Sequence, residues 1–231
     1  MATLGELPAA VPAATVVVIR DGDAGIETLM LRRSGHGAFA GHWVFPGGKV
    51  DDDDRNEHGD EIAWARRAAV REAREEAGIE LGVDDLVVFL HWMPPPIQPK
   101  RFSTWFFAAV APTGDAGDVT IDGHEIHEHA WIAASDAIAR RDEGELELAP
   151  PTWITLHQLA RQRDVKAFMQ WAGNERPRHF YSRSTKVDGV LTLLWEGDAG
   201  YDNGDHHTPG ARNRLTMAPS GWRYDHERAG P

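Results

Sequence analysis

Three glutamates near the middle of the chain have the spacing of a metal-binding helix face. They belong to the segment REAREEAGI at residues 71–79, and on a helix Glu72, Glu75 and Glu76 stand at i, i+3 and i+4 on one face. Like charges at this spacing repel, and no neighbour in the sequence obviously relieves the repulsion. Mg²⁺ binds carboxylate oxygens while it keeps water and substrate phosphate oxygens in its shell. The three glutamates therefore fit metal-assisted chemistry on a diphosphate.

The segments on either side of this helix favour a metal site over a merely solvated acidic face. Glutamate pairs are common on exposed helices, so the three acids alone would favour the solvated face. Upstream, FPGGKV at residues 45–50 is a strand that runs into a glycine turn, where backbone can approach a metal or a phosphate closely. Downstream, Gly78 is placed to cap the helix and Ile79 to pack beneath it.

Together these segments resemble the Nudix hydrolase family, whose signature is Gly, five residues, Glu, seven residues, then Arg-Glu-apolar-any-Glu-Glu-any-Gly-apolar. Gly48 matches the first glycine. The second half matches at every fixed position: Arg71, Glu72, Ala73, Glu75, Glu76, Gly78 and Ile79. The resemblance covers about residues 14–140. It implies a pyrophosphohydrolase that uses Mg²⁺, or Mn²⁺ in its place, to cleave a diphosphate linkage in a small nucleotide-containing substrate.

The chain departs from the family signature at one place. Gly48 and Arg71 are 23 positions apart, where the signature has 14, and the extra residues fall in DDDDRNEHGDE at 51–61. Eight positions before Arg71, where the signature expects glutamate, stands Ala63. Three acids are alternatives for the missing glutamate: Glu57, Asp60 and Glu61. The aspartate run at 51–54 is predicted to be a solvated loop, with outer-sphere metal contacts as the alternative.

Carried over residue by residue, the resemblance assigns roles around this signature. The metal ligands would be Glu72, Glu75 and Glu76, with the carbonyl of Gly47 as a further candidate. Arg71 would position these carboxylates by ion pairing, and Gly48 would lie against the substrate. A catalytically silent nucleotide-binding domain is the alternative function, and the intact set of an arginine and three glutamates argues against it.

A further acid is expected from a later loop, as a metal ligand or as the general base on the attacking water. The segment GHEIHEHAW offers Glu125 and Glu128, and we favour Glu125 because its glycine-containing stretch can reach over a bound metal. Three histidines alternate beside them, at positions 124, 127 and 129. We interpret these as exposed strand histidines rather than a zinc site, which would need a fourth ligand nearby.

Lys100 and Arg101 are candidate substrate contacts because they follow a proline-rich loop and precede an aromatic strand. The whole segment, HWMPPPIQPKRFSTWFF, resembles the branch of the family that includes coenzyme A and acyl-coenzyme A diphosphatases, although the dedicated coenzyme A motif is not found. We therefore expect coenzyme A or its thioesters as substrate. ADP-ribose, dinucleotides and nucleotide sugars are the alternatives.

Composition excludes several other functions. The 231 residues include no cysteine, which rules out disulfides, thiolate zinc sites and a cysteine nucleophile. A formal net charge of −12 argues against a nucleic-acid partner, which would need clustered lysines and arginines. No segment approaches the length of a membrane span, and the N-terminus lacks a basic region before its apolar stretch. We expect a cytoplasmic protein that does not bind membranes, and leave open whether it forms a homodimer.

The order of elements predicts an α/β fold, a Nudix-type α/β/α sandwich on a mixed β-sheet. Strands are expected at 14–20, 27–33, 43–45, 86–92, 102–110 and 128–132, the acid-bearing helix at 62–77 and a shorter helix at 135–144, with Ser135 as its N-cap. The Pro150-Pro151 pair marks a boundary between a domain at 1–150 and an extension at 151–231. The extension is expected to contain two helices and a hairpin around Asp188-Gly189, and to pack on the domain.

Overall fold

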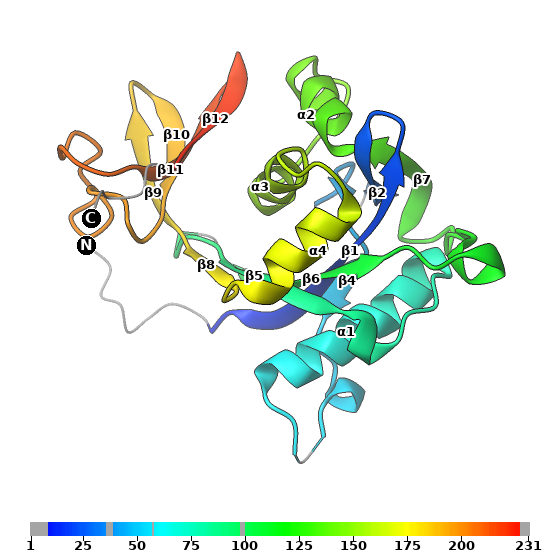
Figure 1. Ribbon diagram of the computed structural model, residues 1–231. Coiled ribbons are helices and arrows are strands. Elements are labelled where there is room, and N and C mark those ends of the chain that lie inside the picture. The colour runs from blue at the N-terminus through cyan, green and yellow to red at the C-terminus, as the bar shows by residue number, and fades with distance from the viewer. Residues whose placement is uncertain (1–8, 36–38, 57, 98–99, 227–231) are drawn as a thin grey trace. The chain divides into compact units, whose positions relative to one another are not determined.

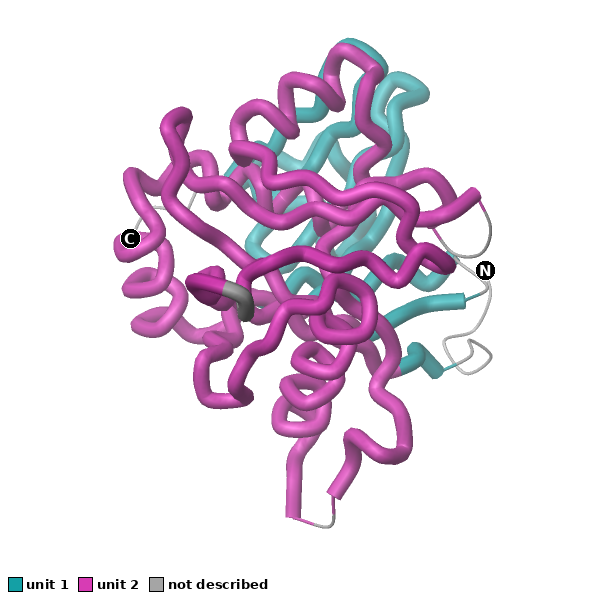
Figure 2. Tube along the Cα trace, turned by 90° about the vertical axis from the view of Figure 1, so that its right-hand side faces the viewer, with its two compact units in different colours: residues 1–11, 92–103, 179–231 teal, residues 12–91, 104–178 magenta. Residues whose placement is uncertain are grey.

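The computed structural model describes residues 9–35, 39–56, 58–97 and 100–226. The chain forms two compact units, drawn in different colours in Figure 2. Unit 2 consists of Pro12–His91 and Thr104–Arg178, and it contains the acid-bearing helix. Unit 1 consists of Met1–Val11, Trp92–Ser103 and His179–Pro231.

Unit 2 is built on a mixed β-sheet (Figure 1). Its strands are β1 (Val11–Gly22), β2 (Gly25–Arg33), β3 (Trp43–Val44), β4 (Gly47–Lys49), β5 (Val87–Met93), β6 (Phe102–Val110) and β7 (Ile126–Ala133). Their order is β3-β2-β1-β6-β5, with β4 paired to β1 and β7 paired to β2. Strands β1 and β2 form the expected antiparallel hairpin. Strand β6 runs parallel to β1, since Val11 N–H donates to Arg101 O and Ala111 N–H to Ile19 O.

Helices cover both faces of this sheet, which confirms the predicted α/β/α sandwich (Figure 1). They are α1 (Glu61–Ala77), α2 (Ala134–Asp142), α3 (Pro150–Leu159) and α4 (Val165–Asn174), with short 3₁₀ turns η1 (Asp52–Asp54), η2 (Val83–Asp85) and η3 (Gly114–Gly117). Helix α2 begins after Ala133, so the prediction of Ser135 as its N-cap was wrong. No helix in the described ranges is long and apolar enough to cross a membrane.

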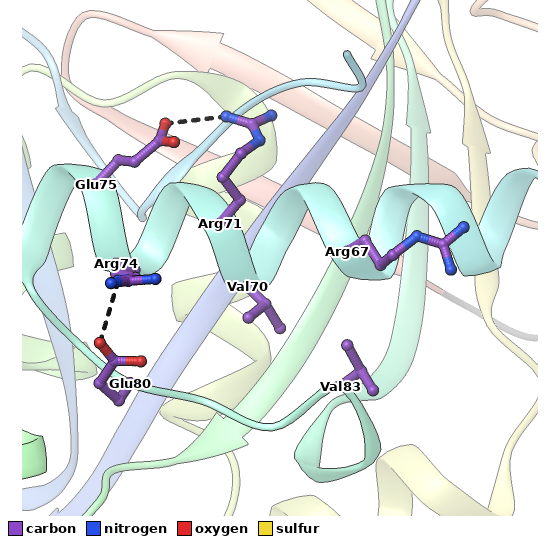
Figure 3. Close-up of a pocket in the computed structure, with 7 residues that line it drawn as sticks. All are labelled: Arg67, Val70, Arg71, Arg74, Glu75, Glu80 and Val83. Carbon is purple, nitrogen blue, oxygen red and sulfur yellow. Dashed lines mark hydrogen bonds and ion pairs between the residues drawn. The ribbon is translucent and has the colours of Figure 1, made fainter. Parts of the chain in front are cut away.

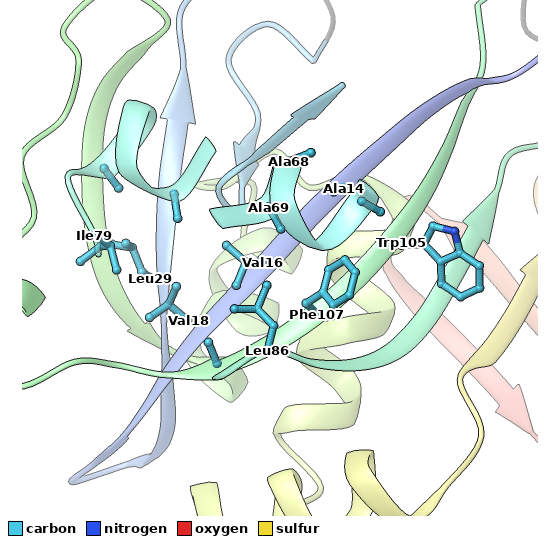
Figure 4. Close-up of a cluster of buried hydrophobic side chains, with 14 of the residues drawn as sticks. Ala14, Val16, Val18, Leu29, Ala68, Ala69, Ile79, Leu86, Trp105 and Phe107 are labelled. Atoms are coloured by element: carbon cyan, nitrogen blue, oxygen red, sulfur yellow. The ribbon is translucent and has the colours of Figure 1, made fainter. Parts of the chain in front are cut away.

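The two faces of the sheet carry separate apolar layers because successive strand residues point to opposite sides. On one side Val16 and Val18 of β1 pack with buried alanines of α1 (Figure 4). The alanine side chains are short, so α1 can approach the sheet closely. On the other side Phe89 of β5 meets Phe106 of β6 and Phe168 of α4 edge to face, with ring centroids 6.5 and 5.5 Å apart.

Both ends of α1 are fixed by the residues that the sequence places there. Asp60 is the N-cap, and its side chain accepts a hydrogen bond of 2.8 Å from Ala63 N–H. Gly78 ends the helix with φ of 68°, a left-handed conformation that glycine adopts at little cost, and its N–H donates to Arg74 O. The predicted helix at 62–77 is confirmed within one residue. Fixed ends hold the acidic face of α1 in one register.

Unit 1 contains β8 (Arg178–Tyr181) and a separate antiparallel sheet in the order β12-β11-β10-β9. The strands of that sheet are β9 (Arg183–Val187), β10 (Val190–Leu194), β11 (Asn213–Ala218) and β12 (Gly221–His226). The predicted hairpin at Asp188-Gly189 is confirmed, with both residues at positive φ, 50° and 82°. A buried ion pair of 2.6 Å between Arg214 and Asp198 joins β11 to the loop after β10.

Helices α3 and α4 belong to unit 2. The backbone N–H of Val165, at the start of α4, donates to the Asp21 carboxylate at the end of β1, at 2.8 Å. The compact unit thus continues past Pro150, and the chain passes into unit 1 after Arg178. The boundary at Pro150 and the packing of the extension as a whole stay predictions.

Replacing Gly78 by alanine should destabilise the protein. A side chain is strained at φ of 68°, and its Cβ would lie 3.2 Å from Thr120. We expect a loss of about 1 kcal/mol, which lowers the melting temperature by about 2–4 °C for a chain of this size. Gly173→Ala in α4 is the matched control, because its Cβ would meet nothing within 4 Å. Calorimetry that found equal melting temperatures for the two variants would contradict the role given to Gly78.

Candidate active site

Two acids of α1 lie against the glycines of β4. Gly47 N–H donates to the Glu76 carboxylate at 2.9 Å, and a Cβ added at Gly48 would clash with the Glu72 carboxylate. At Gly47 a Cβ would lie 2.5 Å from Ala14 O, because β4 pairs tightly with β1. Only glycine fits at both positions. Gly47 and Gly48 therefore let the two carboxylates approach the backbone. They lie in strand β4, so the prediction of a glycine turn here was wrong.

Burial disfavours the charged form of these two acids. The Glu76 side chain is 6% exposed, and burial raises its pKa to about 8, helped by the charge of Glu72 and opposed by the Gly47 N–H. Burial also raises the pKa of Glu72, although the neighbouring Arg71 offsets part of the effect. A buried pair of carboxylates that repel one another is stabilised by any cation that can reach both.

Arg71 binds acids on both sides of itself, and the positioning role that the resemblance implies for it stays a prediction. Its Nη1 donates to Glu72 at 2.9 Å and to Glu75 at 3.0 Å. Its Nε and Nη2 donate to the two carboxylate oxygens of Asp54 at 3.2 and 2.9 Å, and Nη2 also reaches Lys49 O. Asp54 first, and then Glu72, raise the pKa of Arg71 far above its usual value. The guanidinium is permanently charged and fixes Glu72 and Glu75 in place.

Asp54 is the site residue that our reading of the sequence missed. It is 4% exposed, so the prediction that the aspartate run is only a solvated loop was wrong at this position. Asp54 stands six positions after Gly48, which is where the signature expects its glutamate, and it binds Arg71 on both oxygens. Counting forward from the glycine finds it, whereas counting back from the arginine led to Ala63. The extra residues thus lie between Asp54 and Arg71.

The residues considered as replacements for the signature glutamate have other roles where the structure describes them. Asp60 caps α1. Glu61 accepts a hydrogen bond of 3.1 Å from the indole N–H of Trp105. Glu57 lies outside the described residues. Ala63, the position suggested by the spacing, donates its N–H to the Asp60 cap, so it belongs to the start of the helix rather than to the site.

Arg33 links Glu125 to the acids of α1. The Arg33 guanidinium donates to Glu125 at 2.6 Å and to Glu76 at 3.4 Å. The loop that carries Glu125 is fixed by Asp122, whose carboxylate accepts N–H groups of the three residues 124–126. These hydrogen bonds outweigh burial and lower the pKa of Asp122. The structure thus joins Glu125 to the helix that carries the other acids.

Glu128 has a different environment. It pairs with Arg32 at 3.2 Å, and both side chains are about half exposed. Neighbouring residues of β2 point to opposite faces, so Arg32 directs Glu128 away from the face of Arg33. No interaction among the described residues joins Glu128 to Glu72, Glu75 or Glu76. His127 and His129 are exposed beside it on β7, in agreement with their interpretation as surface histidines.

Lys100 and Arg101, the expected substrate contacts, belong to unit 1, whereas the acids belong to unit 2. The Lys100 ammonium lies 5.4 Å from the centre of the Phe102 ring, a cation–π contact. Arg101 accepts a hydrogen bond at its carbonyl from Val11 N–H. Their role in substrate binding stays a prediction.

A hollow of about 460 Å³ lies on the solvent side of α1 (Figure 3). Its lining residues are Arg67, Val70, Arg71, Arg74, Glu75, Glu80 and Val83. Val70 and Val83 point toward one another, while Arg71 pairs with Glu75 and Arg74 with Glu80 at 3.2 Å. The charged side chains in this hollow largely pair with one another. The hollow should therefore bind an anion more weakly than its three arginines suggest.

Comparison with known proteins decides the family. A family model described as NUDIX domain matches residues 10–171, more than half of the chain. The chain belongs to the Nudix family. A Nudix hydrolase from Alicyclobacillus acidocaldarius is similar in structure over 70% of this chain and 96% of its own, with 26% identity and a TM-score of 0.62. A MutT Nudix hydrolase from Burkholderia pseudomallei, at 23% identity, covers 66% of this chain and 99% of its own with a TM-score of 0.50, and shows the shared fold.

The Nudix match and the likeness to a solved Nudix hydrolase identify this chain as a pyrophosphohydrolase. No curated protein matches it. In the described residues no group of three or more His, Asp or Glu is arranged to hold a metal ion. Arg71 and Arg33 bind the carboxylates that the family signature supplies.

Glu76 should make the metal-free Nudix protein less stable as the pH rises. Between the ordinary glutamate value of 4.5 and the folded pKa of about 8, folded Glu76 keeps a proton that the unfolded chain has lost. Stability is therefore lost across that range as the pH increases. Glu76→Gln cannot titrate, so in a chelator its gain in melting temperature should be larger at pH 8 than at pH 5. The exposed Glu80→Gln is the control, and an equal gain for Glu76→Gln at both pH values would contradict the raised pKa.

Proposed function

We propose that this Nudix protein is a Mg²⁺-dependent hydrolase that cleaves the diphosphate linkage of a small nucleotide-containing molecule. One observation carries the proposal: Glu72 and Glu76 are held side by side against the Gly47–Gly48 backbone, where burial raises the pKa of both. Such a pair has little structural value by itself, since burying like charges destabilises a fold. It has value if a divalent cation joins it.

The donor set fits Mg²⁺. The candidate ligands are the hard oxygens of Glu72, Glu75 and Glu76, with the Gly47 carbonyl as a further candidate, and no thiolate ligand is available because the chain has no cysteine. When bound, the ion supplies positive charge to the phosphate oxygens of the substrate, and Mn²⁺ can replace it. Glu75 remains 57% exposed and is the most easily redirected of the three.

Two further side chains of the chain have defined tasks in this proposal. Glu125 accepts the proton of the attacking water, which a carboxylate on a loop above the acids can do once the water is within hydrogen-bond reach. Arg71 does not touch the substrate. It keeps Glu72 and Glu75 turned toward one side of α1 through its two hydrogen bonds of about 3 Å, and Asp54 holds Arg71 from behind.

Coenzyme A or an acyl-coenzyme A is the substrate class that we propose. The support is the resemblance of residues 91–107 to the coenzyme A branch of the family, where Lys100 and Arg101 would bind phosphate groups. ADP-ribose, dinucleotides and nucleotide sugars contain the same diphosphate linkage, and they are the alternatives that a substrate panel distinguishes.

Removing a carboxylate should abolish most activity without unfolding the protein. Glu72→Gln and Glu76→Gln each keep nearly the same volume but lose a charged ligand, and changes around metal sites cost about ten- to a hundredfold. We expect kcat/KM with Mg²⁺ to fall at least that far, while circular dichroism stays unchanged. Glu80→Gln is the control, because Glu80 is exposed and pairs with Arg74 at the surface. Normal turnover of either site variant at saturating Mg²⁺ would refute the ligand assignment.

A panel of diphosphate-linked compounds tests the substrate. With Mg²⁺ and product detection by mass spectrometry, coenzyme A or an acyl derivative should give a higher kcat/KM than nucleoside triphosphates such as dGTP. The products should be two phosphate-bearing fragments, because water attacks one phosphorus of the linkage. If ADP-ribose or dGTP were preferred by tenfold or more, the coenzyme A proposal would be wrong and the reaction class would stand.

A further inference from the structure

Arg33 lies between two acids that come from opposite sides of the candidate active site. It is the last residue of β2, and its guanidinium spans from Glu76 on α1 to Glu125 on the loop before β7, at 3.4 and 2.6 Å. The Arg33 side chain is 21% exposed, against 63% for Glu125, so the arginine is the fixed partner and the glutamate the one that it holds. No part of the family signature contains Arg33.

The backbone around Arg33 also reaches the Glu125 loop. Ser34 N–H donates to Glu125 O at 2.7 Å, next to the side-chain contact. The pairing of β2 with β7 has an irregularity at this point: Arg32 faces Glu128, but Arg33 faces Ile126, so His127 is an extra residue. A bulge of this kind redirects the strand that contains it. Here the bulge places Glu125, the residue before Ile126, next to Arg33.

The Arg33 side chain is held in place by its two contacts with acids, because its third donor group has no partner in the described part of the chain. Arg33 Nε is buried, and it has no hydrogen-bond partner among the described residues. Leaving a buried donor unpaired destabilises the fold. The charge-assisted bonds from Nη1 and Nη2 offset this cost, and both go to acids of the site.

We propose that Arg33 is a positioning residue that holds Glu125 over the acid face of α1, using Glu76 as its anchor. This inference rests on the proposed function, because Glu125 is the acid assigned to the attacking water. Arg33 acts through Glu125 and not on the substrate. The positive charge of Arg33 beside Glu76 also opposes the binding of Mg²⁺ there. Removing Arg33 should therefore lower turnover without weakening the binding of Mg²⁺.

The test is a double-mutant cycle of Arg33→Gln and Glu125→Gln in the full chain, with two readouts. Arg33→Gln should lower kcat at least tenfold, with KM changed by less than about twofold. In the Glu125→Gln background it should cost less than about twofold more, because residues that act as one unit are not additive. Calorimetric titration with Mg²⁺ alone should give the Arg33→Gln protein an affinity equal to or higher than the unaltered protein's.

Two further variants separate charge from geometry and guard against misfolding. Arg33→Lys keeps the charge, but a single ammonium cannot donate to both acids as a guanidinium fork does, so kcat should fall although Mg²⁺ affinity stays unchanged. Arg32→Gln removes the neighbouring arginine, which pairs with Glu128 at the surface, and should retain kcat within about twofold.

The outcomes distinguish this inference from the proposed function. Multiplying losses in the double variant, or a raised KM, would mean that Arg33 acts on its own, and would overturn the inference. Normal turnover of Arg33→Gln and Arg33→Lys with an inactive Glu125→Gln would overturn the inference alone. Normal turnover of Glu125→Gln would overturn both the inference and the role proposed for Glu125. Weaker Mg²⁺ binding in Arg33→Gln would assign the arginine to the metal site instead.

Discussion

The repulsion between Glu72 and Glu76 is the interaction on which the rest of the site depends. Both carboxylates lie where burial raises their pKa, and each is approached by an arginine, Arg71 on one side and Arg33 on the other. Two arginine side chains therefore lie beside the pair even before any metal binds. Each arginine in turn brings a second acid with it. Arg71 brings Asp54, and Arg33 brings Glu125, so the chain's own charges assemble the site around the pair.

The fold supplies the rigidity that such a charged cluster needs. Alanines on the buried face of α1 set the helix close to the sheet, and caps at Asp60 and Gly78 fix its rotation and length. Strand β4 is held by β1, so the glycines that meet the carboxylates cannot retreat from them. The alanines and the acids Glu72 and Glu76 lie on the same face of α1, toward the sheet. Burial of the alanines therefore offsets the cost of holding the two acids there.

The sequence predicted the helix and the common face of its three acids because these depend on spacing within one short segment. Gly47 and Gly48 lie in strand β4 and not in the predicted turn. The positioning role of Arg71 was implied by the resemblance to the family, and it stays a proposal. Asp54 was missed because the insertion was placed before the signature acid instead of after it, an ambiguity that only the ion pair to Arg71 resolves. The part played by Arg33 could not be predicted, since it arises from a bulge between strands that are 92 residues apart at the Arg33–Glu125 contact. The division into units after Arg178 likewise depends on packing that periodicity does not encode.

Locating a bound cation tests the central claim most directly. Crystals of the protein soaked in Mn²⁺, measured at the manganese absorption edge, would give an anomalous peak at each metal position. The account predicts a peak bonded to carboxylate oxygens of Glu72 and Glu76, with Arg71 still paired with Glu72 and Arg33 still paired with Glu76. An anomalous peak only elsewhere in the molecule, in a protein that hydrolyses its substrate with Mn²⁺, would contradict it.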